Sequence, residues 1–339
     1  MTENQWQTLV SIANGVPQEK FTSGFIIDCP WLPNWYGISI LDYFTSDELW
    51  LKANLKALET FPDIIFLPGF WSEYGMCTEP SAFGAKCIFW KDEFPFAEKT
   101  ILSSEEIHNL TKPNAATDGM LPFMLNRLIR NRSAIEDAGH KIRFSVSRGP
   151  MNIASFLMGT TELMTTMMME PDTVHKLMRI ITDFLKEWHQ IQRDAIPSIE
   201  GIMMLDDIVG FVGETEFLEF GMPYFKELYD VDAKVKLFHN DADCTMSIKH
   251  YPEMGVNLYN PGTHMTVAEM QEVTENKMTI LGNIPPRDVL AAGSVDDVKK
   301  ITKELLENTP NKNRLMPSCG GGMPPNVSTE NIKAFLSEL

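Results

Sequence analysis

The sequence lacks any run of about eighteen apolar residues, the length that a helix needs to cross a bilayer. It also lacks a basic start followed by an apolar stretch, so we expect no signal peptide. Basic residues are scarce: 29 Lys and Arg stand against 46 Asp and Glu, for a net charge of −17. An acidic balance of this size argues against the basic face that binding to phosphates or anionic lipids needs, so we expect neither nucleic acid nor a membrane as partner.

Cysteine is sparse and widely spaced in the 339 residues. The five are Cys29, Cys77, Cys87, Cys244 and Cys319. An odd number at these spacings argues against a disulfide framework and favours a reduced, cytoplasmic compartment. No Cys-x-x-Cys pair exists, which excludes a zinc ribbon or a thioredoxin-type site. Neither a GxxxxGK[ST] loop nor a GxGxxG after a strand-like run is present, so nucleotide hydrolysis and the usual dinucleotide fingerprint are unsupported.

Short apolar runs alternate with longer amphipathic stretches along the chain. The eight runs are Phe25–Cys29, Asp63–Leu67, Ile142–Ser147, Gly201–Asp206, Val235–His239, Val256–Tyr259, Met278–Gly282 and Arg314–Pro317. The stretches between them with helical periodicity include Glu48–Thr60, Pro171–Ile191, Thr266–Glu275 and Ser294–Asn308. Such alternation predicts parallel strands with crossover helices, and eight units predict a (β/α)8 TIM barrel. An open, doubly wound sheet is the alternative.

We expect one barrel domain over residues 1–339, because no repeat or low-complexity linker divides the chain. Residues of about 70–136 are aromatic-rich and less periodic. We interpret them as an insertion that forms a lid over one face of the barrel.

Polar residues follow nearly every apolar run, as in barrel enzymes, whose chemistry lies at the carboxyl ends of the strands. The densest group of potential metal ligands runs from His239 through Asp241 to Cys244. Imidazole, carboxylate and thiolate are all ligands that zinc accepts. Cys319, beside three glycines, adds a thiol next to flexible backbone. Each of these residues also has an ordinary structural interpretation.

Two further charged features follow strands. Asp206 and Asp207 are adjacent carboxylates whose repulsion would raise one pKa, which suits a general acid. Helix capping and solvation explain the pair equally well. Arg148 ends another run and could bind a carboxylate or phosphate, or form a surface salt bridge.

Aromatic side chains gather after the first two runs. Trp31, Trp35 and Tyr36 follow the first, and Trp71 follows the second. Aromatic loops at a catalytic face favour a flat, apolar substrate. The alternative is a hydrophobic plug beneath the insertion.

These features resemble the uroporphyrinogen decarboxylase superfamily. The resemblance rests on His239-x-Asp241 after one strand, Ser318-Cys319-Gly320 near the C-terminus, the run Met203–Asp207, the turn Asn260-Pro261-Gly262, and Ile280–Ile284. The likeness covers most of the chain from Phe25 onward. It is closer to the corrinoid-dependent methyltransferases than to the decarboxylases, which carry an Arg-rich segment near the N-terminus; no Arg occurs here in the first 85 residues.

The resemblance implies a zinc ion held by His239, Asp241 and Cys319. Asp241 stands where thiol-activating members have Cys, and Cys244 is a rival ligand. Fewer thiolates make zinc a better Lewis acid, which suits the ether-cleaving members. The expected function is therefore O-demethylation: transfer of a methyl group from an aromatic methyl ether to the cobalamin cobalt of a partner corrinoid protein. Asp206 or Asp207 would protonate the leaving phenolate, and the four aromatic residues would hold the ring.

Three alternatives remain open from the sequence. The first is methyl transfer from a corrinoid to a thiol or a folate. The second is decarboxylation of a tetrapyrrole. The third is a barrel that docks a corrinoid protein or binds a ligand without catalysis.

Overall fold

Parallel strands form the centre of the structure, a computed structural model that describes residues 1–27 and 29–339. The expected first run includes Asp28, which lies outside the described residues. Within them, the parallel strands are β1 Gly24–Ile26, β2 Ile65–Leu67, β5 Phe144–Arg148, β6 Gly201–Leu205, β7 Val235–Asn240, β8 Leu258–Pro261, β9 Thr279–Leu281 and β10 Leu315–Met316. Each of the eight predicted runs therefore overlaps a strand.

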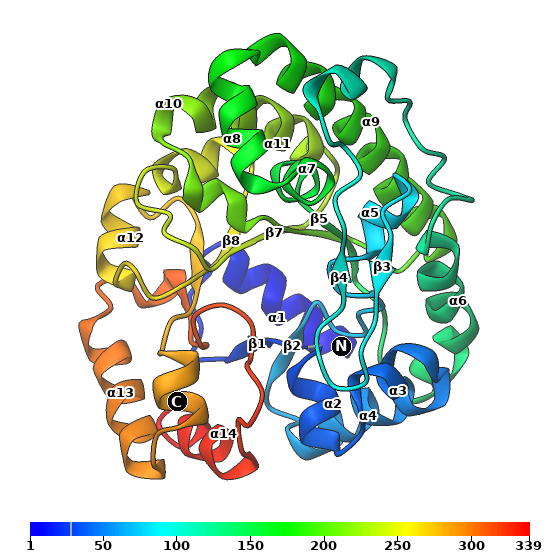
Figure 1. Cartoon of the computed structure of the whole chain (residues 1–339). Coiled ribbons are helices and arrows are strands. Elements are labelled where there is room, and N and C mark those ends of the chain that lie inside the picture. The colour runs from blue at the N-terminus through cyan, green and yellow to red at the C-terminus, as the bar shows by residue number, and fades with distance from the viewer. Residues whose placement is uncertain (28) are drawn as a thin grey trace.

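Strands β5 to β10 pair in chain order, and β1 pairs with β2. The Gly24 N–H donates to the Pro317 carbonyl at 3.2 Å and joins β1 to the end of β10. Helices surround the strands in Figure 1. The predicted α/β barrel is confirmed.

Helices take up most of the remaining chain. They are α1 Glu3–Ala13, α2 Trp31–Tyr36, α3 Ile40–Thr45, α4 Asp47–Thr60, α5 Thr78–Ala82, α6 Leu121–Asp137, α7 Pro150–Met158, α8 Thr160–Met169, α9 Pro171–Ala195, α10 Glu214–Glu216, α11 Met222–Tyr229, α12 Val267–Val273, α13 Val295–Asn308 and α14 Thr329–Leu336. Shorter helical turns are η1 Ser104–Asn109, η2 Asp207–Phe211, η3 Phe217–Gly221, η4 Ile248–Met254, η5 Pro286–Ala291 and η6 Lys312–Arg314. The four predicted helical stretches are confirmed, and Ser294 caps α13 by accepting the Asp297 N–H.

Successive side chains of each strand belong to two different apolar layers. Met203 and Leu205 of β6 point into the barrel, where Met203 is level with Leu237 of β7. Ile202 and Met204 of the same strand pack outward against the helices. Because both faces are buried, the strands read as continuous apolar runs without alternation.

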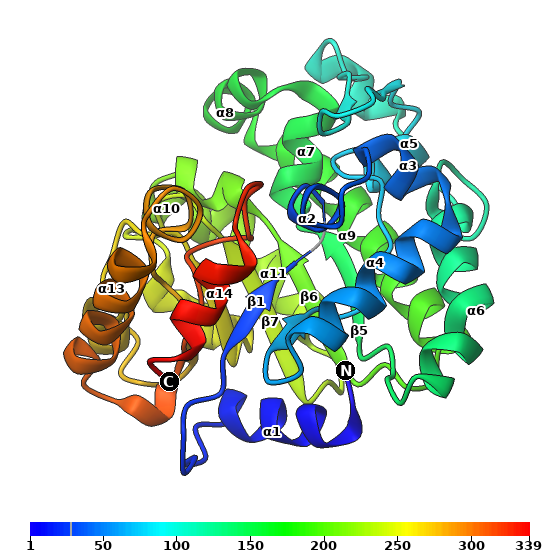
Figure 2. The same ribbon diagram turned by 90° about the horizontal axis from the view of Figure 1, so that it is seen from below.

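Helix α1 closes the amino-terminal end of the barrel, as Figure 2 shows. Trp6 and Leu9 are fully buried in the interior cluster. The Trp6 ring meets Phe144 edge to face at 5.6 Å. This leaves the opposite end of the barrel for polar side chains.

Residues 70–136 contain α5, a short antiparallel hairpin of β3 (Cys87–Ile88) and β4 (Phe96–Ala97), η1 and most of α6. Helix α6 takes the place of the crossover helix between β2 and β5. The part before it, with the hairpin, is the irregular portion of the predicted insertion. Among the described residues, no helix is both long and apolar enough to cross a membrane.

We expect Trp6→Ala to lower the free energy of unfolding by about 3–5 kcal/mol, because it empties the space beneath the strands. It also removes the contact with the Arg143 guanidinium, 5.3 Å above the ring. Urea unfolding measures the change. The control is Asn4→Ala, at an exposed position of the same helix, which should stay within about 0.5 kcal/mol of the parent. Equal stabilities of the two variants would contradict this role of α1.

Candidate active site

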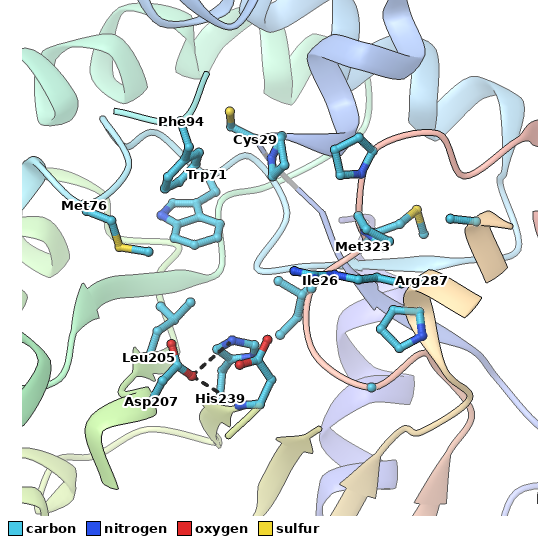
Figure 3. A pocket seen from close by; sticks show the side chains of 18 of the residues that line it. Ile26, Cys29, Trp71, Met76, Phe94, Leu205, Asp207, His239, Arg287 and Met323 are labelled. Carbon is cyan, nitrogen blue, oxygen red and sulfur yellow. Dashed lines mark hydrogen bonds and ion pairs between the residues drawn. The ribbon is translucent and has the colours of Figure 1, made fainter. Parts of the chain in front are cut away.

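A cavity of about 720 Å³ lies at the carboxyl end of the strands. Figure 3 shows Asp207 and His239 at one side, with Trp71, Phe94 and Met76 across from them. The remaining walls come from β1, η5 and the glycine-rich segment after β10. The lining residues are Ile26, Cys29, Pro30, Trp71, Glu73, Met76, Phe94, Arg148, Leu205, Asp207, His239, Asp241, Pro286, Arg287, Ala291, Ala292, Gly320, Gly322, Met323, Pro324, Pro325 and Asn326. An acidic corner, formed by Asp207 and Asp241 with His239, thus faces an apolar wall formed by Trp71, Phe94 and Met76.

His239, at the end of β7, is held in one orientation by Asn260 of β8. The Asn260 amide nitrogen donates to the carbonyls of Leu281 at 2.8 Å and Cys319 at 3.4 Å. Its oxygen is therefore the acceptor for His239 Nδ1, 2.7 Å away. This places the proton on Nδ1 and leaves the Nε2 lone pair for a ligand, the usual arrangement of metal-binding histidines.

Two carboxylates accompany His239. Asp207 Oδ1 lies 3.9 Å from His239 Nε2 and accepts the Asp241 N–H at 3.2 Å. One donor atom from each of Asp207, His239 and Asp241 lies within 4.8 Å of the other two. Burial raises the pKa of Asp207, and the charge of Asp241 adds to the rise.

This donor set fits a divalent metal ion. Two nearby carboxylates repel each other, and a cation between them relieves that repulsion. Imidazole nitrogen and carboxylate oxygen are both zinc ligands. The structure places His239, Asp241 and Asp207 side by side.

The two candidate thiol ligands, Cys319 and Cys244, lie outside this donor set. Cys319 is fully buried, and its Sγ donates to the Gly321 carbonyl at 3.7 Å. Burial raises the pKa of Cys319 to about 12, with a contribution from the charge of Asp241. Cys244 is also buried, with its pKa raised to about 11 by desolvation. Neither thiol is among the lining residues of the cavity.

Gly321 brings the C-terminal loop against the acidic corner. Its φ of +71° suits glycine, and a Cβ there would lie 2.8 Å from Asp241 Oδ2. Its N–H donates to the Pro261 carbonyl at 2.7 Å. The loops after β7, β8 and β10 therefore meet, as a site built from distant segments requires.

The two adjacent aspartates face opposite ways. Asp206 is fully buried and accepts the N–H groups of Met151 at 2.9 Å and Asn152 at 3.0 Å, at the start of α7. Desolvation raises its pKa to about 8 despite these bonds. Asp206 thus anchors a helix, whereas Asp207 lines the cavity.

Arg148 lies in the cavity wall and is engaged by acidic partners. Its Nη2 donates to Glu73 at 2.7 Å, both side chains being buried. The backbone N–H of Arg148 donates to Glu79 Oε1 at 3.2 Å, and its guanidinium lies 5.7 Å from the Trp71 ring. The network holds Trp71 at the cavity.

The other predicted aromatic residues lie outside the cavity lining. Trp31 stacks on Trp35 in α2, with ring centroids 5.3 Å apart. Their ring nitrogens donate to the Val327 carbonyl at 3.1 Å and to Thr329 Oγ1 at 3.0 Å. Tyr36 is half-buried at the end of the same helix. These two hydrogen bonds connect α2 to the C-terminal segment.

Several cavity residues carried no recognisable sequence signal. Met76, Phe94 and Met323 come from irregular segments, and Arg287 follows two prolines in η5. Asn260 was visible at a strand end, but its role depends on lying level with His239 in the next strand.

The uroporphyrinogen decarboxylase family model matches residues 35–339. The chain belongs to this family. It is 24% identical to a uroporphyrinogen decarboxylase of Chlorobium phaeobacteroides over 49% of this chain and 48% of that protein, so this match spans about half the relative's length. It is 22% identical to the enzyme of Hahella chejuensis over 89% of this chain and 85% of that one.

Solved structures share the fold. A methyltransferase from Methanosarcina mazei matches with a TM-score of 0.82 and 18% identity over 98% of this chain and 97% of that one. A B12-independent methionine synthase from Shewanella sp. W3-18-1 matches with a TM-score of 0.57 and 11% identity over 94% and 96%. At these identities the likeness concerns the barrel itself.

We expect Glu79→Gln to flatten the pH dependence of stability between pH 4.5 and about 7. Desolvation raises the pKa of Glu79 from 4.5 to about 7, and its Oε2 has no hydrogen-bond partner among the described residues. Across this window the folded state retains a proton that the unfolded chain releases, so the parent loses stability as pH rises. A shift of this size corresponds to about 3 kcal/mol.

Urea unfolding at pH 4 and pH 8 tests this expectation. The glutamine side chain of the variant can still accept the Arg148 N–H. Relative to the parent, the variant should therefore be more stable at pH 8 than at pH 4. Parallel curves for the two proteins would show that Glu79 titrates normally.

Proposed function

We propose that the chain is a zinc-dependent methyltransferase that moves a methyl group from an aromatic methyl ether to the cobalt of a corrinoid carried by a partner protein. The observation that carries this proposal is the acidic corner with an oriented His239, set opposite the Trp71 wall. Family membership and the fold shared with a methyltransferase support the same reaction class.

His239 and Asp241 would hold the metal. Cys319 would be the third ligand, which requires its Sγ to turn from the Gly321 carbonyl toward these two side chains. The Asn260 hydrogen bond leaves His239 Nε2 available. A bound zinc ion would supply Lewis acidity at the ether oxygen and lower the pKa of the Cys319 thiol. The carbonyl of Cys319 already bonds to the Asn260 side chain that orients His239.

The protein's own side chains would position the substrate and supply a proton. Trp71, held by Arg148, would bind one face of the aromatic ring, and Phe94 and Met76 would exclude water. The leaving phenolate needs one proton when its methyl group departs. We assign that proton to Asp207, because Asp206 is turned toward α7. Asp207 Oδ1 accepts the Asp241 N–H, so the proton belongs on Oδ2.

A tetrapyrrole decarboxylase would need several cationic groups for a polyanionic substrate. Of the two cavity arginines, Arg148 has its guanidinium paired with Glu73, and only Arg287 is exposed. The cavity charges therefore favour the methyltransferase.

We expect His239→Ala, Asp241→Ala and Cys319→Ala each to lose the zinc that the parent retains, at about one ion per chain. Elemental analysis of protein purified without added metal measures this. Cys244→Ala, the rival buried thiol, and His264→Ala, an exposed histidine, are the controls and should keep the metal. Loss of zinc in Cys244→Ala together with retention in Cys319→Ala would reassign the thiol ligand.

We expect Asp207→Asn to slow methyl transfer by about 10²–10⁴-fold while zinc remains bound, because it removes a proton donor and keeps the side-chain shape. The assay follows formation of methylcobalt from a methoxy-aromatic donor and a reduced corrinoid protein. Loss of zinc in this variant would make Asp207 a metal ligand instead. A fully active variant would exclude both roles.

A further inference from the structure

Two of the five cysteines lie side by side in the segment that borders the cavity. Cys77 is fully buried just before α5, and Cys87 is half-buried at the start of β3. Cys87 Sγ donates to the Ala85 carbonyl at 3.5 Å and to the Cys77 carbonyl at 3.9 Å. Both pack in one small apolar cluster with Ala85 and Ala97. The two sulfur atoms are thus neighbours without a disulfide between them.

The two thiols differ in reactivity. The neighbouring Cys77 thiol lowers the pKa of Cys87, whereas the Cys87 thiol and burial raise the pKa of Cys77 above its usual range. Cys87 is also the more accessible, and an accessible thiol of lowered pKa is the one that attacks an oxidant. Cys77 is within reach to complete the exchange.

The pair connects two segments that supply the apolar wall. Met76 directly precedes Cys77, and Phe94 lies in the hairpin loop that follows Cys87; both line the cavity. Gly75 packs against this loop so closely that a Cβ there would lie 2.7 Å from Pro95 Cγ and 2.9 Å from Phe94 Cε1. A covalent link between residues 77 and 87 would tie the two segments together.

We propose that Cys77 and Cys87 are a redox-modification site, oxidised by a low-molecular-weight disulfide, that fixes the wall carrying Met76 and Phe94. The Cys87 thiolate attacks one sulfur of the oxidant and releases one small thiolate, leaving a mixed disulfide on Cys87. The Cys77 thiol then attacks Cys87 Sγ, and its proton passes to the second small thiolate as that thiolate is released. The protein loses two protons and two electrons, and the oxidant is reduced to two thiols.

Oxidised glutathione, applied to the whole chain, tests the site. In the parent we expect a Cys77–Cys87 disulfide by peptide mapping, with two thiols lost and no glutathione retained. Cys77→Ala should stop at glutathione bound to Cys87, and Cys87→Ser should form neither product. Cys244→Ser is the matched control and should behave as the parent does. A stable mixed disulfide in the parent, or pairing of any other cysteines, would overturn the proposal.

Hydrogen exchange tests the consequence without any assay of methyl transfer, so its result is independent of the proposed function. Amides in residues 74–77 and 87–97 should exchange at least about threefold more slowly in the oxidised parent than in the reduced one. Glutathione-treated Cys87→Ser should show no change. An oxidised parent with unchanged exchange in both segments would refute the fixing of the cavity wall.

Discussion

Closure of one end of the barrel by α1 is the constraint on which the site depends. Trp6 and Leu9 fill the space beneath the strands, and Met203, Leu205 and Leu237 continue the apolar interior above them. The amino-terminal end of the barrel is thus filled by apolar side chains. Since parallel strands all finish at the opposite end, their polar terminal residues converge there.

Within that end, neighbouring strands determine what each polar residue can do. The histidine of β7 acquires its orientation from the asparagine level with it on β8, whose own amide is held by β9 and the C-terminal loop. The two aspartates after β6 are adjacent in sequence but serve different surroundings. Asp206 accepts a backbone N–H at the amino end of α7, and Asp207 lies beside His239 and Asp241.

The cavity wall opposite is built by irregular chain. Trp71 is placed by the Arg148–Glu73 ion pair, a contact between β5 and the loop after β2. Phe94 and Met76 arrive from the β3–β4 hairpin and the segment before α5, which contact each other at Gly75. Strand pairing in this wall is limited to the short β3–β4 hairpin, whereas paired parallel strands order the acidic corner, so a cross-link would restrain the wall more.

The sequence by itself determined the barrel, the eight strands and the placement of His239 and Asp241 at a strand end. Hydrophobic runs and helical periodicity are local properties, and parallel strands follow from their alternation. Only the tertiary structure decided which aspartate lines the cavity, that Trp71 does so while Trp31 and Trp35 stack in α2, and that Asn260 orients His239. These outcomes depend on which side chains lie level on adjacent strands and on where irregular segments pack, and neither follows from spacing along the chain.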